Sequence, residues 1–234
     1  DLGASVVNAD SKFNFLCCTD QKCSKKCCSN LNILLPPYDV LRIRKRLGLS
    51  FSEFIDIYGK VKILERIGLP VVTLRMREDN ELSCPFFNYN GCSIHSDRPS
   101  ICRYYPLIPK QQLEVITSGQ DFLLTKWRNC QGFHKSKEWT VREWRSENEI
   151  ALYDSFNNQW REIIKQFESN ISTKKIIKLS KEKFKKLFFL ASYDLDKFRA
   201  YTYNHIMPNP KDTNKKFPHI IENDLQLIQF SFEW

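Results

Sequence analysis

The density of cysteines constrains this chain more than any other feature of its sequence. Five of the nine cysteines fall within residues 17–28, and the other four follow after a long gap. The nine are Cys17, Cys18, Cys23, Cys27, Cys28, Cys84, Cys92, Cys102 and Cys130. Thiols gathered this closely are typical of a metal or redox site rather than of hydrophobic packing alone.

Length and composition decide between metal ligands and disulfides. A chain of 234 residues with 42% hydrophobic residues buries a core without covalent staples. The longest apolar stretches, such as residues 187–191, are too short to cross a bilayer, so no transmembrane segment is expected. We therefore expect a cytoplasmic protein, in which clustered thiols are metal ligands or redox groups rather than disulfides. Part of the formal net charge of +9 is expected to offset metal-bound thiolates.

Two helices are expected after the first cysteine group. Apolar residues recur at helical spacing from Tyr38 to Leu47, and Gly48 is suited to end that helix. The sequence from Ser50 to Glu53 is a capping box, which predicts a second helix from Phe51 to Tyr58. Residues 1–11 show no periodicity and are expected to form a loose arm.

The second cysteine group is expected on a hairpin and a short helix. Residues 69–77 and 81–87 are rich in β-branched and alternating side chains, which predicts two antiparallel strands joined by a turn. Residues 96–99 predict the start of a short helix that carries Cys102. A further short strand is expected at Leu113–Thr117. The hairpin would present Cys84 on a strand and Cys92 just beyond it.

The C-terminal part reads as helical. A capping box from Thr140 to Glu143 predicts one long helix that runs to about Phe167. Further helices are expected over 194–206 and 222–234, and residues 174–186 form a lysine-rich amphipathic segment. The expected fold class is thus mainly α with a small antiparallel β-hairpin near residues 69–87. A metal-centred cysteine-cluster domain over 13–139 carries a helical extension over 140–234, and both parts are expected to form one structural unit.

The spacing of the cysteines bears on the metal. Zinc knuckles place two residues between paired cysteines, and no such pair occurs in this chain. Iron–sulfur clusters tolerate irregular spacing, which favours iron with sulfide. Adjacent Cys27 and Cys28 would face opposite sides of an extended segment, so they are expected to serve different sites or to divide into one ligand and one packing residue. Eight thiols suit two four-thiolate centres, or one cluster with a companion metal or redox pair.

Three charged or titratable residues flank the second cysteine group. Arg98 and Arg103 lie on either side of Cys102, where cations lower the pKa of thiols and offset the charge of a cofactor. The alternative is that both arginines form surface salt bridges. His95 is expected to be a surface or hydrogen-bonded histidine rather than a ligand. The aromatic residues around the site, Phe86, Phe87, Tyr104 and Tyr105, are expected to keep water away from it.

Several segments together resemble the YkgJ-like cysteine-cluster family, to which zinc or iron chelation is attributed. The resemblance covers residues 13–144 and is carried by FNFLCC, CSKKCC, CPFFN, GCSIH, RPSICRYYP, CQGF and TVREW. It implies a ligand set whose first member is Cys17 or Cys18. With Cys18 in that place, the set is Cys18, Cys23, Cys27, Cys28, Cys84, Cys92, Cys102 and Cys130. The chain departs from the tight opening spacing of the family, because extra residues separate Cys18 from Cys23.

These observations predict a metal-binding protein with a multi-cysteine centre. An iron–sulfur cluster of the 4Fe-4S type is favoured, and zinc or iron ions are the alternative; its role would be structural, redox or catalytic. The chain is also distantly similar to flagellin lysine N-methylase, which implies S-adenosylmethionine-dependent methyl transfer to a protein substrate through the cluster. No glycine-rich nucleotide loop is present, so the cosubstrate would bind at or beside the cluster. A third possibility is a structural zinc module whose segment Lys174–Lys186 binds nucleic acid.

Overall fold

The structure is a computed structural model of the 234-residue chain. It describes residues 3–17, 26–65, 67–88, 90–109, 122–127, 130–134, 137–172, 181–205 and 217–234. The chain divides into two compact units, each built from two segments. Unit 1 comprises Asp1–Ile33 and Met76–Tyr153, and unit 2 comprises Leu34–Arg75 and Asp154–Trp234. The predicted division into a metal-binding domain over 13–139 and a helical extension over 140–234 stays a prediction.

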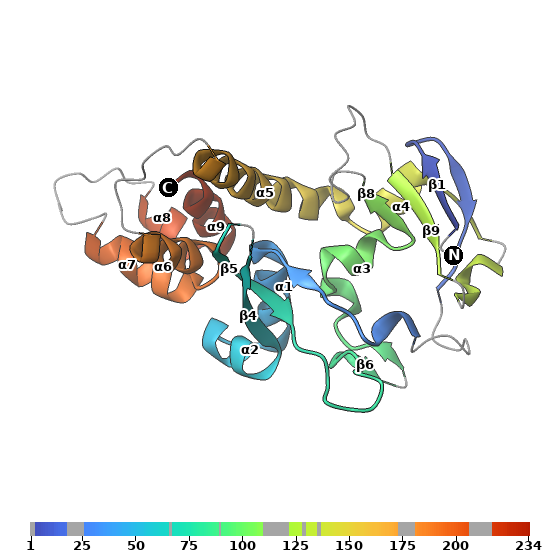
Figure 1. Cartoon of the computed structure of the whole chain (residues 1–234), viewed down its shortest axis with the longest axis horizontal. Coiled ribbons are helices and arrows are strands. Elements are labelled where there is room, and N and C mark those ends of the chain that lie inside the picture. Colours follow the sequence, from blue (N-terminus) through green and yellow to red (C-terminus); the bar gives the residue numbers. More distant parts are fainter. Residues whose placement is uncertain are drawn as a thin grey trace. The chain divides into compact units, whose positions relative to one another are not determined.

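Short antiparallel strands from distant parts of the sequence pair in unit 1. In Figure 1, β9 (Phe122–Lys126) lies between β1 (Gly3–Val7) and β8 (Leu107–Pro109). The other two pairs are β2 (Lys12–Asn14) with β10 (Glu138–Thr140), and β6 (Phe87–Asn88) with β7 (Gly91–Cys92). The expectation of a loose N-terminal arm is therefore wrong. All five residues of β1 pair with β9, and Val7 buries its side chain in the core.

The helices of unit 1 are short. They are the 3-10 helices η1 (Lys26–Cys28), η2 (His95–Asp97) and η4 (Gln131–His134), and the α-helices α3 (Ser100–Tyr104) and α4 (Val141–Glu147). The predicted short helix carrying Cys102 is confirmed as α3. The Thr140–Glu143 capping box is also confirmed at the start of α4, where the Thr140 side chain accepts from the Glu143 N–H and the Glu143 carboxylate accepts from the Thr140 N–H.

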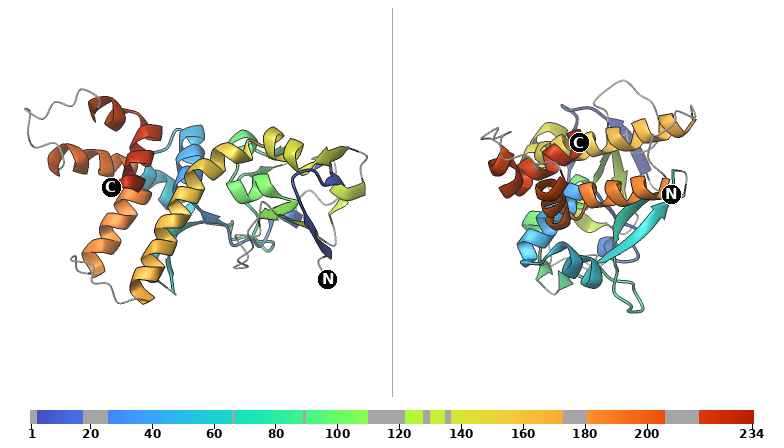
Figure 2. Two further views of the ribbon diagram at one scale, coloured as in Figure 1. Left: turned by 90° about the horizontal axis from the view of Figure 1, so that it is seen from above. Right: turned by 90° about the vertical axis from the view of Figure 1, so that its left-hand side faces the viewer.

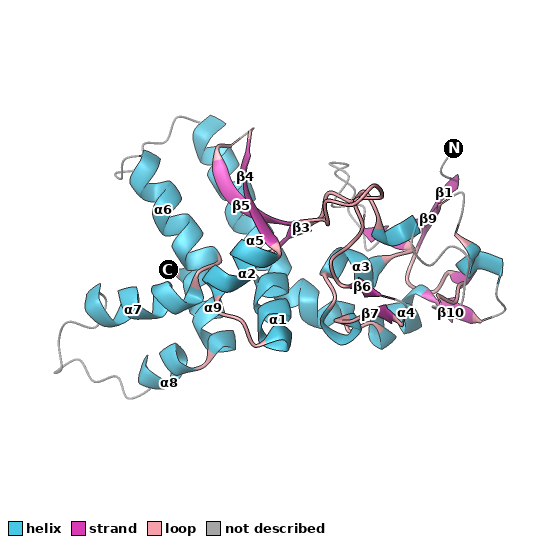
Figure 3. Cartoon of the chain, turned by 90° about the horizontal axis from the view of Figure 1, so that it is seen from below, coloured by secondary structure: helices cyan, strands magenta, loops and turns pink. Residues whose placement is uncertain are grey.

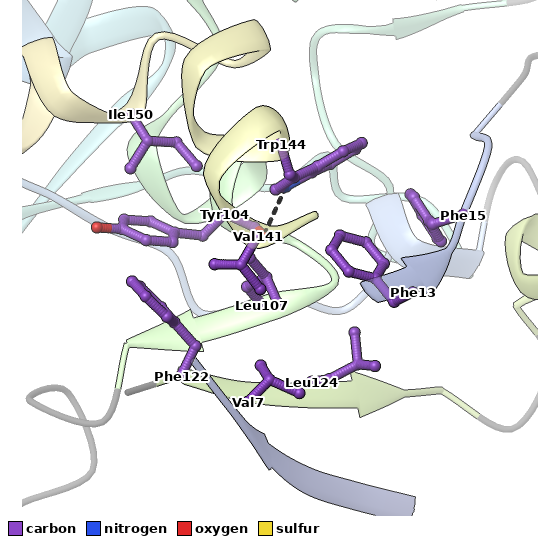
Figure 4. Packing of buried hydrophobic residues seen from close by; sticks show 10 residues of the cluster. All are labelled: Val7, Phe13, Phe15, Tyr104, Leu107, Phe122, Leu124, Val141, Trp144 and Ile150. Carbon is purple, nitrogen blue, oxygen red and sulfur yellow. Dashed lines mark hydrogen bonds between the residues drawn. The ribbon is translucent and has the colours of Figure 1, made fainter. Parts of the chain in front are cut away.

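The core of unit 1 is rich in aromatic side chains (Figure 4). The ring of Phe15 packs edge-on against Phe133 and Trp144, with ring centroids 5.1 and 5.5 Å away. The indole N–H of Trp144 donates to the Tyr104 carbonyl at 3.2 Å, drawn as the dashed line in Figure 4. Gly132 is required beside Phe15, because a Cβ atom there would lie 2.6 Å from the Phe15 ring. Of the described cysteines, Cys130 packs against this core.

The predicted continuous helix from Thr140 to Phe167 is wrong. Helix α4 ends at Glu147, and α5 (Ile150–Ser172) begins after Glu149, whose φ is 51°. The break has a tertiary cause, because the Asn148 carbonyl accepts a hydrogen bond from the buried Arg103 guanidinium at 2.9 Å. The Asn148 amide in turn donates to the Trp144 carbonyl at 2.8 Å. These bonds take up backbone groups that a continuous helix would have paired internally.

The sheet of unit 2 has β5 (Leu69–Leu74) between β3 (Leu34–Leu35) and β4 (Gly59–Leu64), all antiparallel. The predicted strand at residues 69–77 is present, but its predicted pairing with residues 81–87 is wrong. Its hairpin partner is β4, and the turn uses Gly68 at φ 70°, whose N–H donates to the Leu64 carbonyl. Strand β4 is largely exposed, and Lys60 and Lys62 interrupt its apolar residues, so its sequence did not indicate a strand. Every residue of β5 is buried.

Helices make up most of the rest of unit 2. They are α1 (Pro37–Leu47), α2 (Phe51–Ile57), most of α5, α6 (Lys181–Ser192), α7 (Leu195–His205), α8 (Phe217–Glu222) and α9 (Asp224–Glu233). Helix α2 packs against β4 and α6 packs against β5, as Figure 3 shows. Helices α5 and α6 lie side by side in Figure 2, joined by stacked Phe167 and Phe184 rings 4.5 Å apart. No helix in the described ranges is long and apolar enough to cross a membrane.

Local sequence signals in unit 2 are confirmed. Helix α1 ends at Gly48, which is left-handed with φ 68°, and the Ser50–Glu53 capping box starts α2. The helices expected over 194–206 and 222–234 appear as α7 and α9. The lysine-rich segment lies partly outside the described residues, which contain only its α6 portion. The strand expected at Leu113–Thr117 also lies outside them.

The predicted fold class is wrong. The described strands form four separate antiparallel sheets of two or three strands, not one small hairpin in a mainly α fold. The physical reason is that most of these strands are two to six residues long and pair with distant partners. Such strands carry too few alternating positions to show in the sequence, and their pairing depends on tertiary contacts.

Candidate metal centre

All six predicted ligand cysteines that the structure describes belong to unit 1. Cys27 and Cys28 lie on η1, Cys92 on β7 and Cys102 on α3, whereas Cys84 and Cys130 lie in the connections before β6 and η4. All six are half-buried, and none forms a disulfide. Cys18 and Cys23 lie outside the described residues, and Cys17 is exposed. The protein thus presents reduced thiols from five separate segments.

Cys27 and Cys28 form a close pair of thiols. Their Sγ atoms are 3.9 Å apart, on a turn of 3-10 helix. The premise that these neighbours face opposite sides of an extended segment is therefore wrong, because a turn can bring adjacent side chains together. Two sulfurs bound to one tetrahedral metal at about 2.3 Å lie about 3.8 Å apart. The observed spacing fits two thiolates on the same metal atom.

Backbone pairing brings Cys84 to this pair. The Cys84 N–H donates to the Cys28 carbonyl at 2.6 Å, and the Asn30 N–H donates to the Leu82 carbonyl at 2.9 Å. A β-bridge between Ser29 and Ser83 lies between these two bonds. The segments around residues 28–30 and 82–84 therefore run antiparallel, which joins the first cysteine group to the second.

The β6–β7 hairpin holds Cys92 near Cys84. Phe87 pairs with Cys92 across the hairpin, and the Phe87 N–H donates to the Cys84 carbonyl at 3.1 Å. Burial is the main cause that raises the pKa of the Cys84 thiol, and the charge of Cys92 adds to it. Burial also raises the pKa of Cys92. These two thiols are thus close enough for the charge of one to affect the other.

Electrostatic coupling extends to Cys102. Hydrogen bonding to Cys28 lowers the pKa of the Cys27 thiol to about 7. The hydrogen bond to Cys27, then burial, then the charges of Cys27, Cys84 and Cys102 raise the pKa of Cys28. Several thiolates in such a site repel one another unless a cation offsets their charge. A bound metal would supply that cation.

Arg98 and Arg103 differ in what they contact. Arg98 donates to the His95 carbonyl at 2.6 Å and to the Asn148 side-chain oxygen. Its positive charge acts against the rise in the pKa of Cys92, and the charge of Cys102 acts on Arg98 in turn. Arg103 is almost fully buried and donates to the Arg98 carbonyl, the Asn148 carbonyl and the Tyr153 hydroxyl. Arg103 therefore ties α3 to the start of α5, and of these two arginines Arg98 is the one whose charge acts on a thiol.

Cys130 is the described cysteine whose contacts are with the aromatic core. It packs against the aromatic core of unit 1, as do Tyr105 and Phe133. The Cys130 N–H donates to the Trp127 carbonyl at 2.8 Å. The sequence assigned Tyr105 only to an apolar wall, and it gave Asn148 no role. The phenolic hydroxyl of Tyr105 could have indicated a polar role, because a buried tyrosine hydroxyl usually has a hydrogen-bond partner.

The donor set fits a soft or borderline metal. Within the described ranges, no three His, Cys, Asp or Glu side chains lie close enough together to hold a metal ion. The Cys27–Cys28 pair nevertheless has the spacing of two ligands, and thiolates select zinc, iron and iron–sulfur centres. The fit thus rests on the sulfur spacing and on the chemistry of the gathered thiols.

Half-buried, reduced thiols presented by several segments of one unit are typical of cysteine-rich metal-binding proteins. The family model CxxCxxCC, described as "Putative zinc- or iron-chelating domain", matches residues 17–143, which is more than half of the chain. The chain belongs to this family. The sequence-based resemblance is thereby confirmed. No curated protein and no solved structure matches the chain.

The chain departs from the spacing that the family name describes. The name places two residues between successive single cysteines and ends on an adjacent pair. Here four residues separate Cys18 from Cys23 and three separate Cys23 from Cys27, while the adjacent pair is kept as Cys27 and Cys28. The retained part of the motif is thus the part whose sulfurs lie 3.9 Å apart.

Proposed function

We propose that this protein binds zinc or iron through cysteine thiolates, with Cys27 and Cys28 on the same metal atom. The observation that carries the proposal is the 3.9 Å distance between their sulfurs, which matches the spacing in a tetrahedral thiolate site. The Cys84 N–H donates to the Cys28 carbonyl, and the charges of Cys84 and Cys102 help to raise the pKa of Cys28, so these two are further candidate ligands. Cys18, Cys23, Cys92 and Cys130 supply the remaining predicted thiolates.

The finer proposal is that the metal is iron with sulfide. Iron–sulfur clusters use four cysteines, which gives two thiolates per iron in a two-iron cluster and one per iron in a four-iron cluster. A single zinc or iron ion, or a two-iron cluster, therefore accommodates Cys27 and Cys28 together. The 4Fe-4S cluster that the thiol count favours would take only one of them at each iron. Within this proposal, the spacing of the pair supports a two-iron cluster over a 4Fe-4S cluster.

Arg98 would offset the charge of the centre. Its guanidinium is fixed by the His95 carbonyl and the Asn148 side chain, and it acts electrostatically on Cys92 and Cys102. A cation fixed beside thiolates stabilises their charged form and tunes the metal they hold. The role of the centre is structural in this proposal, because it joins segments that are distant in the sequence. Metal-binding free energy then becomes folding free energy.

Metal and acid-labile sulfide analysis of anaerobically purified protein tests this proposal. We expect stoichiometric zinc or iron in the wild type and a large loss in both Cys27→Ser and Cys28→Ser. Cys17→Ser is the matched control, because this exposed thiol precedes the site and its loss should leave metal content unchanged. If only one of these two variants loses metal, a 4Fe-4S cluster is supported, because each of its irons takes one thiolate. Absence of both metals from the wild type would overturn the proposal.

A further inference from the structure

Strand β4 is an outer strand of the sheet in unit 2 (Figure 3). It pairs with β5 along all six of its residues, and no described strand pairs with its other side. In an antiparallel pair, successive residues direct their backbone N–H and C=O groups alternately toward the partner strand and away from it. One edge of β4 therefore presents backbone groups that β5 does not use.

The register of the pair shows which residues of β4 have these open groups. The Arg75 N–H donates to the Tyr58 carbonyl at 2.7 Å, which continues the pairing by one residue and directs the even-numbered residues of β4 toward β5. The Thr73 hydroxyl donates to the Lys60 carbonyl at 3.2 Å, in agreement with this direction. The backbone groups of Val61 and Ile63 thus point away from β5, and no other described segment forms a hydrogen bond with them.

The side chains of β4 separate by chemistry onto the two faces of the strand. Val61 and Ile63 lie on one face and are 43% and 54% exposed. Lys60 and Lys62 lie on the other face and are also exposed. An open row of backbone groups is a template for pairing with another chain. A strand added at this edge would meet apolar side chains on one face and positive charges on the other.

The two lysines decide which chain suits this edge. A second copy of β4 could add in two antiparallel registers that pair both Val61 and Ile63 with residues of the copied strand. One register places Lys62 opposite Lys62 of the copy, and the other places Lys60 opposite Lys62. Like charges directly opposite each other destabilise a strand pair, whereas opposite charges stabilise it. Charge complementarity therefore favours an acidic strand over a second copy of this chain.

We propose that the open edge of β4 binds an extended segment of a partner protein in which acidic and apolar side chains alternate. The main chain of that segment bonds the open N–H and C=O groups of Val61 and Ile63. Its acidic side chains lie beside Lys60 and Lys62, and its apolar side chains cover Val61 and Ile63. This surface belongs to unit 2, which has no cysteine, so it uses no residue of the proposed metal centre.

The test titrates full-length protein into a fluorescein-labelled peptide in which glutamate and valine alternate, and it follows the fluorescence anisotropy. We expect saturable binding, together with slower hydrogen exchange of the Val61 and Ile63 amides in the complex. A peptide with lysine in place of glutamate should bind at least about 10-fold more weakly, because its charges would lie opposite Lys60 and Lys62.

Two variants separate the backbone contribution from the charge contribution. Val61→Pro removes an N–H that faces away from β5, and an edge strand tolerates proline at such a position. It should keep the thermal transition of the wild type and weaken binding of the acidic peptide at least about 10-fold. Lys60→Glu combined with Lys62→Glu should weaken it by about 10-fold. Lys183→Glu combined with Lys186→Glu is the matched control, because it makes the same charge change at exposed positions of α6.

Several results would overturn the inference. They are a wild-type protein that does not bind the acidic peptide, equal binding of the acidic and basic peptides, and a folded Val61→Pro variant that binds as tightly as the wild type. A wild-type homodimer that Val61→Pro dissociates would also overturn it, in favour of a second copy at this edge. None of these measurements reports on bound metal, so their failure is distinguishable from failure of the proposed function.

Discussion

Unit 1 and unit 2 reach a stable fold by different means. Unit 2 contains no cysteine, and it buries a six-residue strand against α6, a helix of 12 residues. Unit 1 contains all nine cysteines, and its strands and complete helices are two to seven residues long. Short strands and single helical turns are marginal by themselves. The comparison teaches that unit 2 is stabilised by apolar burial, whereas in unit 1 the proposed metal centre would add to the aromatic core.

Metal removal should separate the two units most sharply. Structural zinc in small domains contributes on the order of 10 kcal/mol or more. A chelator under reducing conditions should therefore expose the amides of unit 1, including the β1–β9 pairs, to fast hydrogen exchange. The amides of β5 in unit 2 should keep their protection. Equal loss of protection in both units would show that the comparison is wrong.

A large-to-small substitution in the core of unit 2 should destabilise unit 2 without loss of metal. Phe54 is fully buried on α2, and truncation of a buried Phe to Ala typically costs about 3–5 kcal/mol. Phe54→Ala should lower the thermal transition of unit 2 by a corresponding amount and leave metal content unchanged. Loss of stoichiometric metal in this variant would indicate that the centre depends on unit 2.

A smaller change tests the core of unit 1. In Gly132→Ala, the new methyl group would lie 2.6 Å from the Phe15 ring, so the ring must shift. Overpacking of this kind costs about 1–3 kcal/mol. We expect lower stability of unit 1 by denaturant titration, together with faster loss of metal to a chelator. Gly3→Ala is the control, because nothing lies within 4 Å of a Cβ atom there.

An ion-pair network in unit 2 should contribute still less. Asp224 accepts from Lys45 at 3.0 Å and from Arg199. Burial opposes ionisation of Asp224, but hydrogen bonds from Lys45 and Arg199 outweigh it and lower the pKa of the carboxyl. The stabilisation is thus present above the unfolded pKa of Asp and lost as the pH falls through the folded value. Asp224→Asn should cost about 1 kcal/mol at neutral pH, and the difference from wild type should shrink in acid.

The smallest effect is expected at Cys17. Its side chain is exposed, and the resemblance to the family leaves Cys17 or Cys18 as the first ligand. Cys17→Ser should retain wild-type metal content and stability, whereas Cys18→Ser should lose metal. The reverse result would exchange the two assignments.

Local signals in the sequence predicted local structure well. The Ser50–Glu53 and Thr140–Glu143 capping boxes and the left-handed Gly48 appear as expected, because each depends on a few neighbouring residues. The density of cysteines indicated a metal or redox site, and several cysteine-bearing motifs indicated a zinc- or iron-chelating family, which the family match confirms.

Features that depend on distant residues were not predictable from the sequence. The break at Asn148 depends on Arg103, and the strand nature of residues 3–7 depends on β9. The 3-10 turn that brings the sulfurs of Cys27 and Cys28 close together is set by tertiary context, whereas the prediction assumed the alternating side chains of an extended segment. Propensity cannot supply such information, since the deciding contacts lie tens of residues away.

The central claim is that a metal bound by thiolates organises unit 1. X-ray absorption at the metal edge of anaerobically purified, full-length protein tests it most directly. We predict zinc or iron with a first coordination shell made of sulfur at about 2.3 Å. A shell of oxygen or nitrogen ligands, or a protein without either metal, would contradict the account.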